Sequence, residues 1–372
     1  MRDKKIGRII ILASFIIVIC LYRVLWIWGE KYEDQTNYDN REKATRPDFS
    51  LEGYGTYTSD FTDYFNDNLP FRNSLITLNS ELDYYCFKKT SIKNVVIGKN
   101  NWLFYCNEND GDPIASYRGE NLYTENELFE IAQNCIKQRD ILKSMGKEFV
   151  IFIAPNKERV YPEFMPEKYG EPASNYRVLQ IVNYLKDNTD LRIVYPYEEL
   201  MDAKNKINEN IWYKTDTHWN YVGGYIGASA LLDELGIFMP KIESKDICIT
   251  SRGESFGDLA SMLSMRKQFE SVDTEYEVTG YDLHNRQDIE WNFNEMVRYR
   301  ATGADPRSIY VIRDSFSTHM APYIGSQFAN SYLRNKSTYT YDDLMECNPD
   351  IVVYEIVERN AWLLKTFSIK SE

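Results

Sequence analysis

Mostly apolar runs alternate with amphipathic stretches along most of the chain. The runs at 149–154, 191–195, 308–312 and 351–356 are apolar at nearly every position, which is typical of strands buried on both faces. Apolar residues at helical spacing predict helices over 176–185 and 220–235, and a third after the capping-box pair Thr124 and Glu127. Buried strands separated by helices predict a parallel sheet in a three-layer α/β/α domain.

Two other regions complete this pattern. Residues 57–85 predict helix, and residues 95–98 and 102–105 predict two strands around a turn. Residues 237–305 lack the alternation and carry four glycines. We interpret them as an insertion or loop region close to the site.

The N-terminal apolar run has the length of a membrane span. From residue 6 to residue 28 there are 23 residues, which at about 1.5 Å per residue cover roughly 34 Å, enough for a hydrocarbon core of about 30 Å. Residues 1–28 hold a net charge of +4, so the other 344 residues hold −17. This asymmetry predicts a cytoplasmic N-terminus and an extracytoplasmic remainder. A cleaved signal peptide would export the same domain, although no small-x-small cleavage site follows the run.

These observations predict a single-pass protein of the cell membrane. Its parts are a cytoplasmic tail at 1–8, a transmembrane signal anchor at 9–28, a polar stalk at 29–50 and one domain at 51–372.

Composition narrows the function further. The 372 residues are 43% hydrophobic, enough for a sizeable core, and the formal net charge is −13. An acidic balance argues against nucleic acid as a partner. Five cysteines outside the apolar run are widely spaced and show no zinc-binding pattern, although one bridge, Cys86 to Cys106, stays open.

Asp216 and His218 form the first candidate catalytic pair. In an extended segment, side chains two positions apart leave the same side of the backbone. The carboxylate would then accept a hydrogen bond from one imidazole nitrogen and leave the other free to act as a base. The pair alone also fits a structural role in which Asp216 caps the following helix.

Ser315 is the candidate nucleophile. It follows the apolar run at 308–312 and precedes a helix, where parallel sheets bind ligands and backbone N–H groups face a developing oxyanion. A helix N-cap is the alternative role for this serine.

Taken together, these segments resemble the DHHW group of the SGNH hydrolase-like acetyltransferases, which contains the alginate O-acetylation proteins. The resemblance spans about residues 95–360. It rests on the segments Asp216-Thr217-His218-Trp219-Asn220, Asp314-Ser315-Phe316, 97–105, 154–157, 257–259 and 349–359.

The resemblance implies a flavodoxin-like SGNH domain with Ser315 as nucleophile, His218 as general base and Asp216 as the residue that orients His218. It implies O-acetylation of an exported or cell-wall polysaccharide through an acetyl-serine intermediate. A membrane-bound O-acyltransferase partner would deliver the acetyl group. The Ser315 backbone N–H is the expected oxyanion donor. Arg313 stands where the family has glycine, and this larger residue could alter the backbone path there or reach substrate.

Four further residues are candidates for substrate contact. Trp219 and Tyr323 are the aromatic residues nearest the triad in sequence, and aromatic rings stack on sugars. Lys157 ends a buried strand at the ligand edge of the sheet, and Arg313 precedes the Asp-Ser pair.

The other two histidines have weaker claims. His319 is a rival base without an adjacent acid, and His284 is interpreted as a loop residue. No cluster with metal-ligand spacing stands out, so we expect neither a metal nor a cofactor.

Two other functions remain open. An esterase with the same triad would release acetyl groups to water. A noncatalytic polysaccharide-binding or scaffold protein of a secretion complex would use the fold without the chemistry.

Overall fold

The computed structural model describes residues 11–17, 20–21, 42–49, 54–69, 71–281 and 284–370. The chain divides into two compact units, one of residues 1–92 with 261–265 and the other of residues 93–260 with 266–372.

The first unit is helical over most of residues 54–87. It contains α2 (Tyr54–Asp67), α3 (Arg72–Glu81) and a π-helical turn, η1 (Leu82–Phe87). The helical expectation for 57–85 is therefore confirmed, with a break before α3 at Phe71, whose backbone is left-handed (φ 58°).

The expected anchor at 9–28 and the stalk at 29–50 lie largely outside the described residues. Among the residues that are described, no helix combines the length and the apolar character needed to cross a bilayer.

A seven-stranded sheet forms the middle layer of the second unit. Its strands, in spatial order, are β4 (Arg192–Val194), β3 (Glu148–Ala154), β11 (Ile351–Val357), β9 (Asp305–Arg313), β10 (Phe328–Asn335), β8 (Met296–Ala301) and β7 (Arg286–Trp291). The five strands from β4 to β10 run parallel, and Val353 of β11 lies opposite both Val150 and Val311.

The expectation of a purely parallel sheet is wrong. β8 pairs antiparallel with β10, and β7 pairs antiparallel with β8. Two consecutive antiparallel strands need only a short connection, whereas parallel strands need a crossover. This edge could therefore form from residues 286–301, inside the region expected to be loops.

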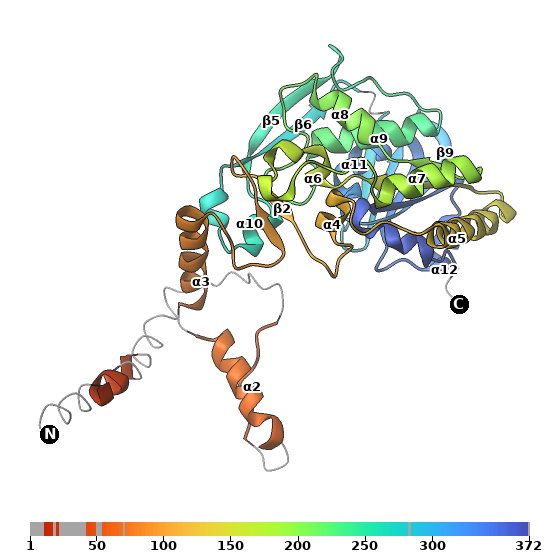
Figure 1. Cartoon of the computed structure of the whole chain (residues 1–372). Helices are drawn as coiled ribbons and strands as arrows, with labels where there is room; N and C mark the ends of the chain where they lie inside the picture. Colours follow the sequence, from red (N-terminus) through yellow and green to blue (C-terminus); the bar gives the residue numbers. More distant parts are fainter. Residues whose placement is uncertain are drawn as a thin grey trace, which may run out of the picture. The chain divides into compact units, whose positions relative to one another are not determined.

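Helices cover both faces of the sheet, as expected for three layers. The helices on one face are α8 (Tyr197–Lys204), α9 (Tyr221–Glu234) and α11 (Ser317–Gly325), which lie together in Figure 1. The elements on the other face are α5 (Glu125–Ser144), α7 (Arg177–Asn188), α12 (Tyr341–Cys347) and the 3-10 helix η5 (Glu358–Lys365).

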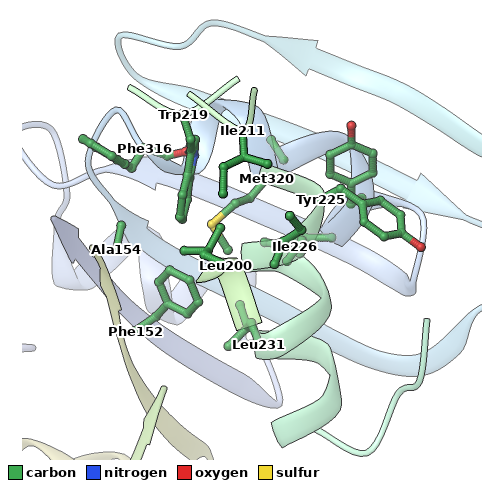
Figure 2. Packing of buried hydrophobic residues seen from close by; sticks show 14 of the residues in the cluster. Phe152, Ala154, Leu200, Ile211, Trp219, Tyr225, Ile226, Leu231, Phe316 and Met320 are labelled. Carbon is green, nitrogen blue, oxygen red and sulfur yellow. The ribbon is translucent and has the colours of Figure 1, made fainter. Parts of the chain in front are cut away.

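The strand side chains explain why both faces are covered. Phe152 and Ala154 of β3 pack toward α8, α9 and α11 (Figure 2), while their neighbours Ile151 and Ile153 join the opposite core. All four side chains are fully buried. Continuous apolar runs are thus a consequence of a sheet with two cores.

Two hairpins and several short helices complete the second unit. The hairpins are β1 (Val95–Ile97) with β2 (Leu103–Tyr105), and β5 (Cys248–Ser255) with β6 (Asp273–Thr279). The short helices are α4 (Pro113–Arg118), α6 (Lys157–Val160), η2 (Pro162–Phe164), η3 (Glu167–Tyr169) and η4 (Arg266–Phe269), together with the first three residues of α10 (Asp258–Met262), whose last two residues are assigned to the first unit. All six cysteines of the chain are free thiols.

Candidate active site

Ser315 lies in the tight turn between β9 and α11. Asp314 fixes this turn, because its Oδ1 accepts a hydrogen bond from the Phe316 N–H at 2.9 Å and its Oδ2 accepts one from the Val357 N–H of β11 at 2.8 Å. The Ser315 side chain itself is exposed. α11 begins at Ser317 rather than at Ser315, so Ser315 is not part of the helix.

Asp216 and His218 lie on a loop that leads into α9. An isolated antiparallel bridge between Trp212 and Trp219 closes the loop. The loop is bent rather than extended, and the Asp216 Oδ1 accepts a hydrogen bond from the His218 N–H at 2.9 Å. Asn220, not Asp216, caps α9 through bonds from the N–H groups of Val222 and Gly223.

The fold brings Ser315, His218 and Asp216 into one hydrogen-bonded chain. His218 Nε2 lies 2.7 Å from Ser315 Oγ, across 97 positions of sequence. His218 Nδ1 lies 2.6 Å from Asp216 Oδ1. One imidazole nitrogen therefore faces the carboxylate and the other faces the hydroxyl, as general-base activation of a serine requires.

The electrostatics of the pair favour a basic imidazole. Burial lowers the pKa of His218, but attraction to the Asp216 carboxylate and their hydrogen bond outweigh it, so the pKa lies above its ordinary value of 6.5. Burial alone would raise the pKa of Asp216, yet the His218 charge and the hydrogen bonds it receives hold that pKa well below its ordinary range. Asp216 is thus an ionised partner at neutral pH.

Asp258 is a second acid beside this pair, and sequence reasoning missed it. Its Oδ1 accepts the Thr217 N–H at 2.8 Å, its Oδ2 accepts the Thr217 hydroxyl at 2.6 Å, and its own N–H donates to Asp216 Oδ2 at 2.8 Å. A Cβ on the preceding Gly257 would lie 2.4 Å from the Asp216 N, so only glycine permits this approach. The available signal was the segment 257–259, which entered the family resemblance without a role for Asp258.

Asp273 and Lys157 hold the base of the loop. Asp273 accepts hydrogen bonds from the backbone N–H groups of Lys214 and Thr215 and from the Thr215 hydroxyl. Lys157 Nζ donates to the carbonyl oxygens of Leu103 at 2.6 Å, Lys214 at 2.7 Å and Asp216 at 2.9 Å. Burial lowers the pKa of Lys157 to about 8.

The four residues expected to contact substrate are buried and hydrogen-bonded to backbone carbonyls, and Tyr323 also lines a cavity next to β6. Lys157 supports the loop, as described above. Trp219 is fully buried and donates from Nε1 to the Phe316 carbonyl at 2.9 Å, next to Ser315 (Figure 2). Arg313 donates to the carbonyl of Asp314 at 3.1 Å. Tyr323, 2% exposed, donates to the carbonyl of Tyr221 at 2.9 Å.

The two other histidines stand apart from the triad. The His319 ring is 6.4 Å from the His218 ring and packs edge-on against the Tyr221 ring at 4.8 Å. Burial first, and then the charge of His218, lower the pKa of His319 to about 3, so it is neutral at ordinary pH. His284 lies in a turn before β7, in left-handed backbone (φ 40°).

In the described part of the chain, one group offers the ligand atoms for a metal ion, namely Asp216, His218 and Asp258. All four carboxylate oxygens of this group already accept hydrogen bonds from His218, Asp258 or Thr217. These oxygens therefore accept the hydrogen bonds that hold the loop and orient the imidazole.

A three-layer α/β/α domain with a Ser-His-Asp contact at the carboxyl edge of its sheet is the arrangement of SGNH hydrolase-like proteins. Residues 95–292 match the family described as SGNH hydrolase-like domain, acetyltransferase AlgX. This match covers more than half of the chain, and the protein belongs to that family. The matched residues include Asp216 and His218 and end before Ser315.

Curated relatives agree with the resemblance drawn from the motifs. The chain is 26% identical over 217 residues to the "Probable alginate O-acetylase AlgJ" of Azotobacter vinelandii, covering 57% of this chain and 52% of the relative. It is 26% identical over 223 residues to the protein of that name from Pseudomonas syringae pv. tomato, covering 59% and 53%. The chain thus matches about half the length of these relatives.

Solved structures show the same fold. A DHHW family protein from Eubacterium siraeum superposes with a TM-score of 0.53 at 14% identity, covering 75% of this chain and 99% of that one. Bacillus cereus PatB1, solved with a sulfonyl adduct, superposes with a TM-score of 0.51 at 14% identity, covering 74% and 99%.

Proposed function

We propose that the protein is an O-acetyltransferase that modifies an exported or cell-wall polysaccharide through an acetyl-Ser315 intermediate. The observation that carries the proposal is the 2.7 Å contact between His218 Nε2 and Ser315 Oγ, backed by Asp216 at 2.6 Å. Membership of an acetyltransferase family supports acetyl as the group that is transferred.

The first half-reaction loads the serine. His218 Nε2 accepts the proton of Ser315 as Oγ attacks the acetyl carbonyl of the donor, and the tetrahedral oxyanion forms beside the turn. The expected donor of a hydrogen bond to this oxyanion is the Ser315 backbone N–H. Collapse of the tetrahedral species breaks the donor's acyl bond, and the His218 proton passes to the leaving group.

The second half-reaction transfers the acetyl group from Ser315 to the acceptor. A sugar hydroxyl gives its proton to His218 and attacks the acetyl carbonyl of Ser315. The ester bond to Oγ breaks, Oγ recovers the proton, and the sugar leaves as an acetate ester. Asp216 stabilises the imidazolium in both halves.

The exposure of Ser315 favours a second candidate, a polysaccharide acetyl esterase. Water reaches an exposed acetyl-serine without displacing any side chain. Transfer then requires that a bound glycan compete with water for the same carbonyl.

We further propose that the domain works on the extracytoplasmic side, tethered by residues 9–28. The supporting observations are the span length of residues 6–28 and the charge step from +4 to −17. A donor on that side is needed because acetyl-CoA is cytoplasmic, and a membrane-bound O-acyltransferase partner would supply it.

The test is a product assay on the full chain given an aryl acetate as donor and a panel of polysaccharides as acceptors. The account predicts acetylated glycan by mass spectrometry, absent with Ser315→Ala. Free acetate with no acetylated glycan would favour the esterase. If the Ser315→Ala variant restored acetylation in cells that lack the protein, the scaffold role would stand instead.

A further inference from the structure

A cavity of about 410 Å³ lies in the second unit, within the usual size range of small-molecule sites, about 300–1,000 Å³. β5, β6, β7, α11 and the start of α9 supply its walls. We call it the β6 cavity. Its walls include Tyr221, Arg252, Glu275, Glu277, Arg286 and Trp291.

Two ring contacts link a wall of the β6 cavity to the catalytic imidazole. The His218 ring lies 6.4 Å from the His319 ring, which lies 4.8 Å from the ring of Tyr221, a wall residue. A second connection runs from Glu275 in the wall to the hydroxyl of Tyr213, at 2.6 Å. Tyr213 is itself in edge-on contact with His319. The rings of His319 and Tyr221 thus lie between the cavity and His218, so a glycan seated in the cavity would reach Ser315 with a sugar that extends beyond these rings.

The walls combine aromatic rings with hydrogen-bonding groups, as sugar recognition requires. A pyranose offers an apolar C–H face to an aromatic ring and hydroxyl groups at its edge. Trp291 is 49% exposed and rests edge-on against Phe293, so part of its indole is open to a ligand. Glu275 and Thr279 add acceptors and a hydroxyl to the same walls.

The charges in the walls are balanced. Arg252 is paired with Glu277, and Arg286 lies 3.2 Å from Asp288 and donates to the Pro322 carbonyl at 2.7 Å. Both guanidinium groups that line the cavity are thus already neutralised by neighbouring acids. Glu275 adds a carboxylate, and the nearby triad region adds Asp216 and Asp258.

We propose that the β6 cavity is the acceptor subsite and that it takes an uncharged glycan rather than a polyuronate. A polyuronate would bring a carboxylate on each sugar toward Glu275 without an unpaired cation to receive it. An uncharged glycan meets only the rings and the hydrogen-bonding groups. This inference rests on the proposed function, because the cavity matters as an acceptor site only if Ser315 carries an acetyl group.

The test measures binding without chemistry, on the full chain carrying Ser315→Ala. The probes are hexasaccharides of β-1,4-linked glucose and N-acetylglucosamine, and a β-1,4-linked mannuronate hexamer as the anionic counterpart. We expect at least one uncharged hexamer to bind about tenfold more tightly than the mannuronate hexamer, with an affinity that does not fall as salt is raised.

Trp291→Ala should weaken that binding about tenfold, because it removes the exposed ring. The matched control is Trp362→Ala, which removes an indole of similar exposure (44%) on η5, outside the walls of the cavity. It should leave affinity unchanged.

The inference is overturned if the mannuronate hexamer binds as tightly as the uncharged ones, if no uncharged hexamer binds, or if the two tryptophan variants behave alike. These outcomes differ from failure of the proposed function. That failure would appear as an unmodified Ser315 in the acetyl-donor assay, whatever the glycans do.

Discussion

The Nζ atom of Lys157 lies 2.9 Å from the carbonyl oxygen of Asp216, so the first residue of α6 holds the backbone of the candidate catalytic loop. The same ammonium group donates to the carbonyls of Leu103 and Lys214. One buried cation therefore joins the β1–β2 hairpin and the Asp216 loop to the end of β3.

Replacement of Lys157 by Met should cost stability as well as activity. Three carbonyl oxygens would lose their charged donor, and of these the Lys214 oxygen keeps the Leu103 N–H, so we expect the free energy of unfolding to fall by about 2–4 kcal/mol. Urea denaturation measures this. Lys99→Met, at a half-exposed lysine whose partner Glu167 is exposed, is the control and should change stability by less than about 0.5 kcal/mol. A Lys157→Met variant as stable as that control would remove the loop-holding role.

The pH dependence of the acetyl-transfer rate should report the basicity of His218. The imidazole must be neutral to accept a proton, and its pKa is raised above 6.5. Activity should therefore fall as the pH drops through a midpoint above 6.5. Asp216→Asn removes the charge that raises the pKa of His218 most and leaves burial, which lowers that pKa. The midpoint of the pH profile should therefore move to lower pH, and the plateau rate should fall. The measurement is kcat/KM against pH.

Asp258→Asn is the graded comparison for that profile. Asp258 Oδ2 lies 3.9 Å from His218 Nδ1, against 2.6 Å for Asp216 Oδ1. In the Asp258→Asn variant the midpoint of the pH profile should also move to lower pH, by a smaller amount than in Asp216→Asn. Equal midpoints in the wild type and in Asp216→Asn would show that another group controls the acid limb.

Glu355 should behave as a neutral acid beneath the nucleophile turn. Its Oε2 accepts the Asp314 N–H at 2.9 Å and the Ser317 hydroxyl at 2.7 Å. Burial first, and then the Asp314 charge, raise its pKa well above the ordinary value of 4.5. A raised pKa of an acid adds stability only at low pH, and that stability is lost as the pH rises toward the folded pKa.

Glu355→Gln keeps the acceptor oxygen and removes the ionisation. It should therefore equal or exceed the wild type in unfolding free energy at pH 7, with an advantage that grows from about pH 4.5 upward. Glu355→Ala, which leaves Asp314 N–H and Ser317 unpaired, should lose about 2–4 kcal/mol. Denaturation at several pH values measures the unfolding free energy of both variants. A similar loss of unfolding free energy in Glu355→Gln and Glu355→Ala would mean that the ionised carboxylate is required.

Sequence patterns located β4, β3, β11 and β9 but not the neighbouring strands β10, β8 and β7. β3, β9 and β11 were predictable because strands with a core on each face need apolar residues at successive positions. β7 carries Gln287, Asp288 and Glu290 at exposed or half-exposed positions, and β10 carries Asn330 and Arg334. Such strands are stabilised by pairing within the sheet, which no local pattern reveals.

The same contrast holds for the site. The sequence pointed to Ser315, His218 and Asp216 because a serine between a buried strand and a helix, together with an Asp-x-His pair, is typical of general-base activation of a nucleophile. The supporting residues were not, since Lys157, Trp219, Arg313 and Tyr323 are types that bind sugars when exposed, and only tertiary packing showed them to be buried. Asp273 contacts the loop from β6, 58 positions away in sequence, and no sequence pattern around it indicated this contact.

The most direct test of the central claim is the mass of the protein and of its peptides after brief exposure to an aryl acetate, compared across the wild type, His218→Ala and Ser315→Ala. The account predicts one acetyl group on the wild type, located at Ser315, with loading slowed by about a thousandfold or more in His218→Ala and absent at that site in Ser315→Ala. Thermal unfolding of each variant should match the wild type. Acetylation of another residue at the wild-type rate in folded Ser315→Ala protein would contradict the account.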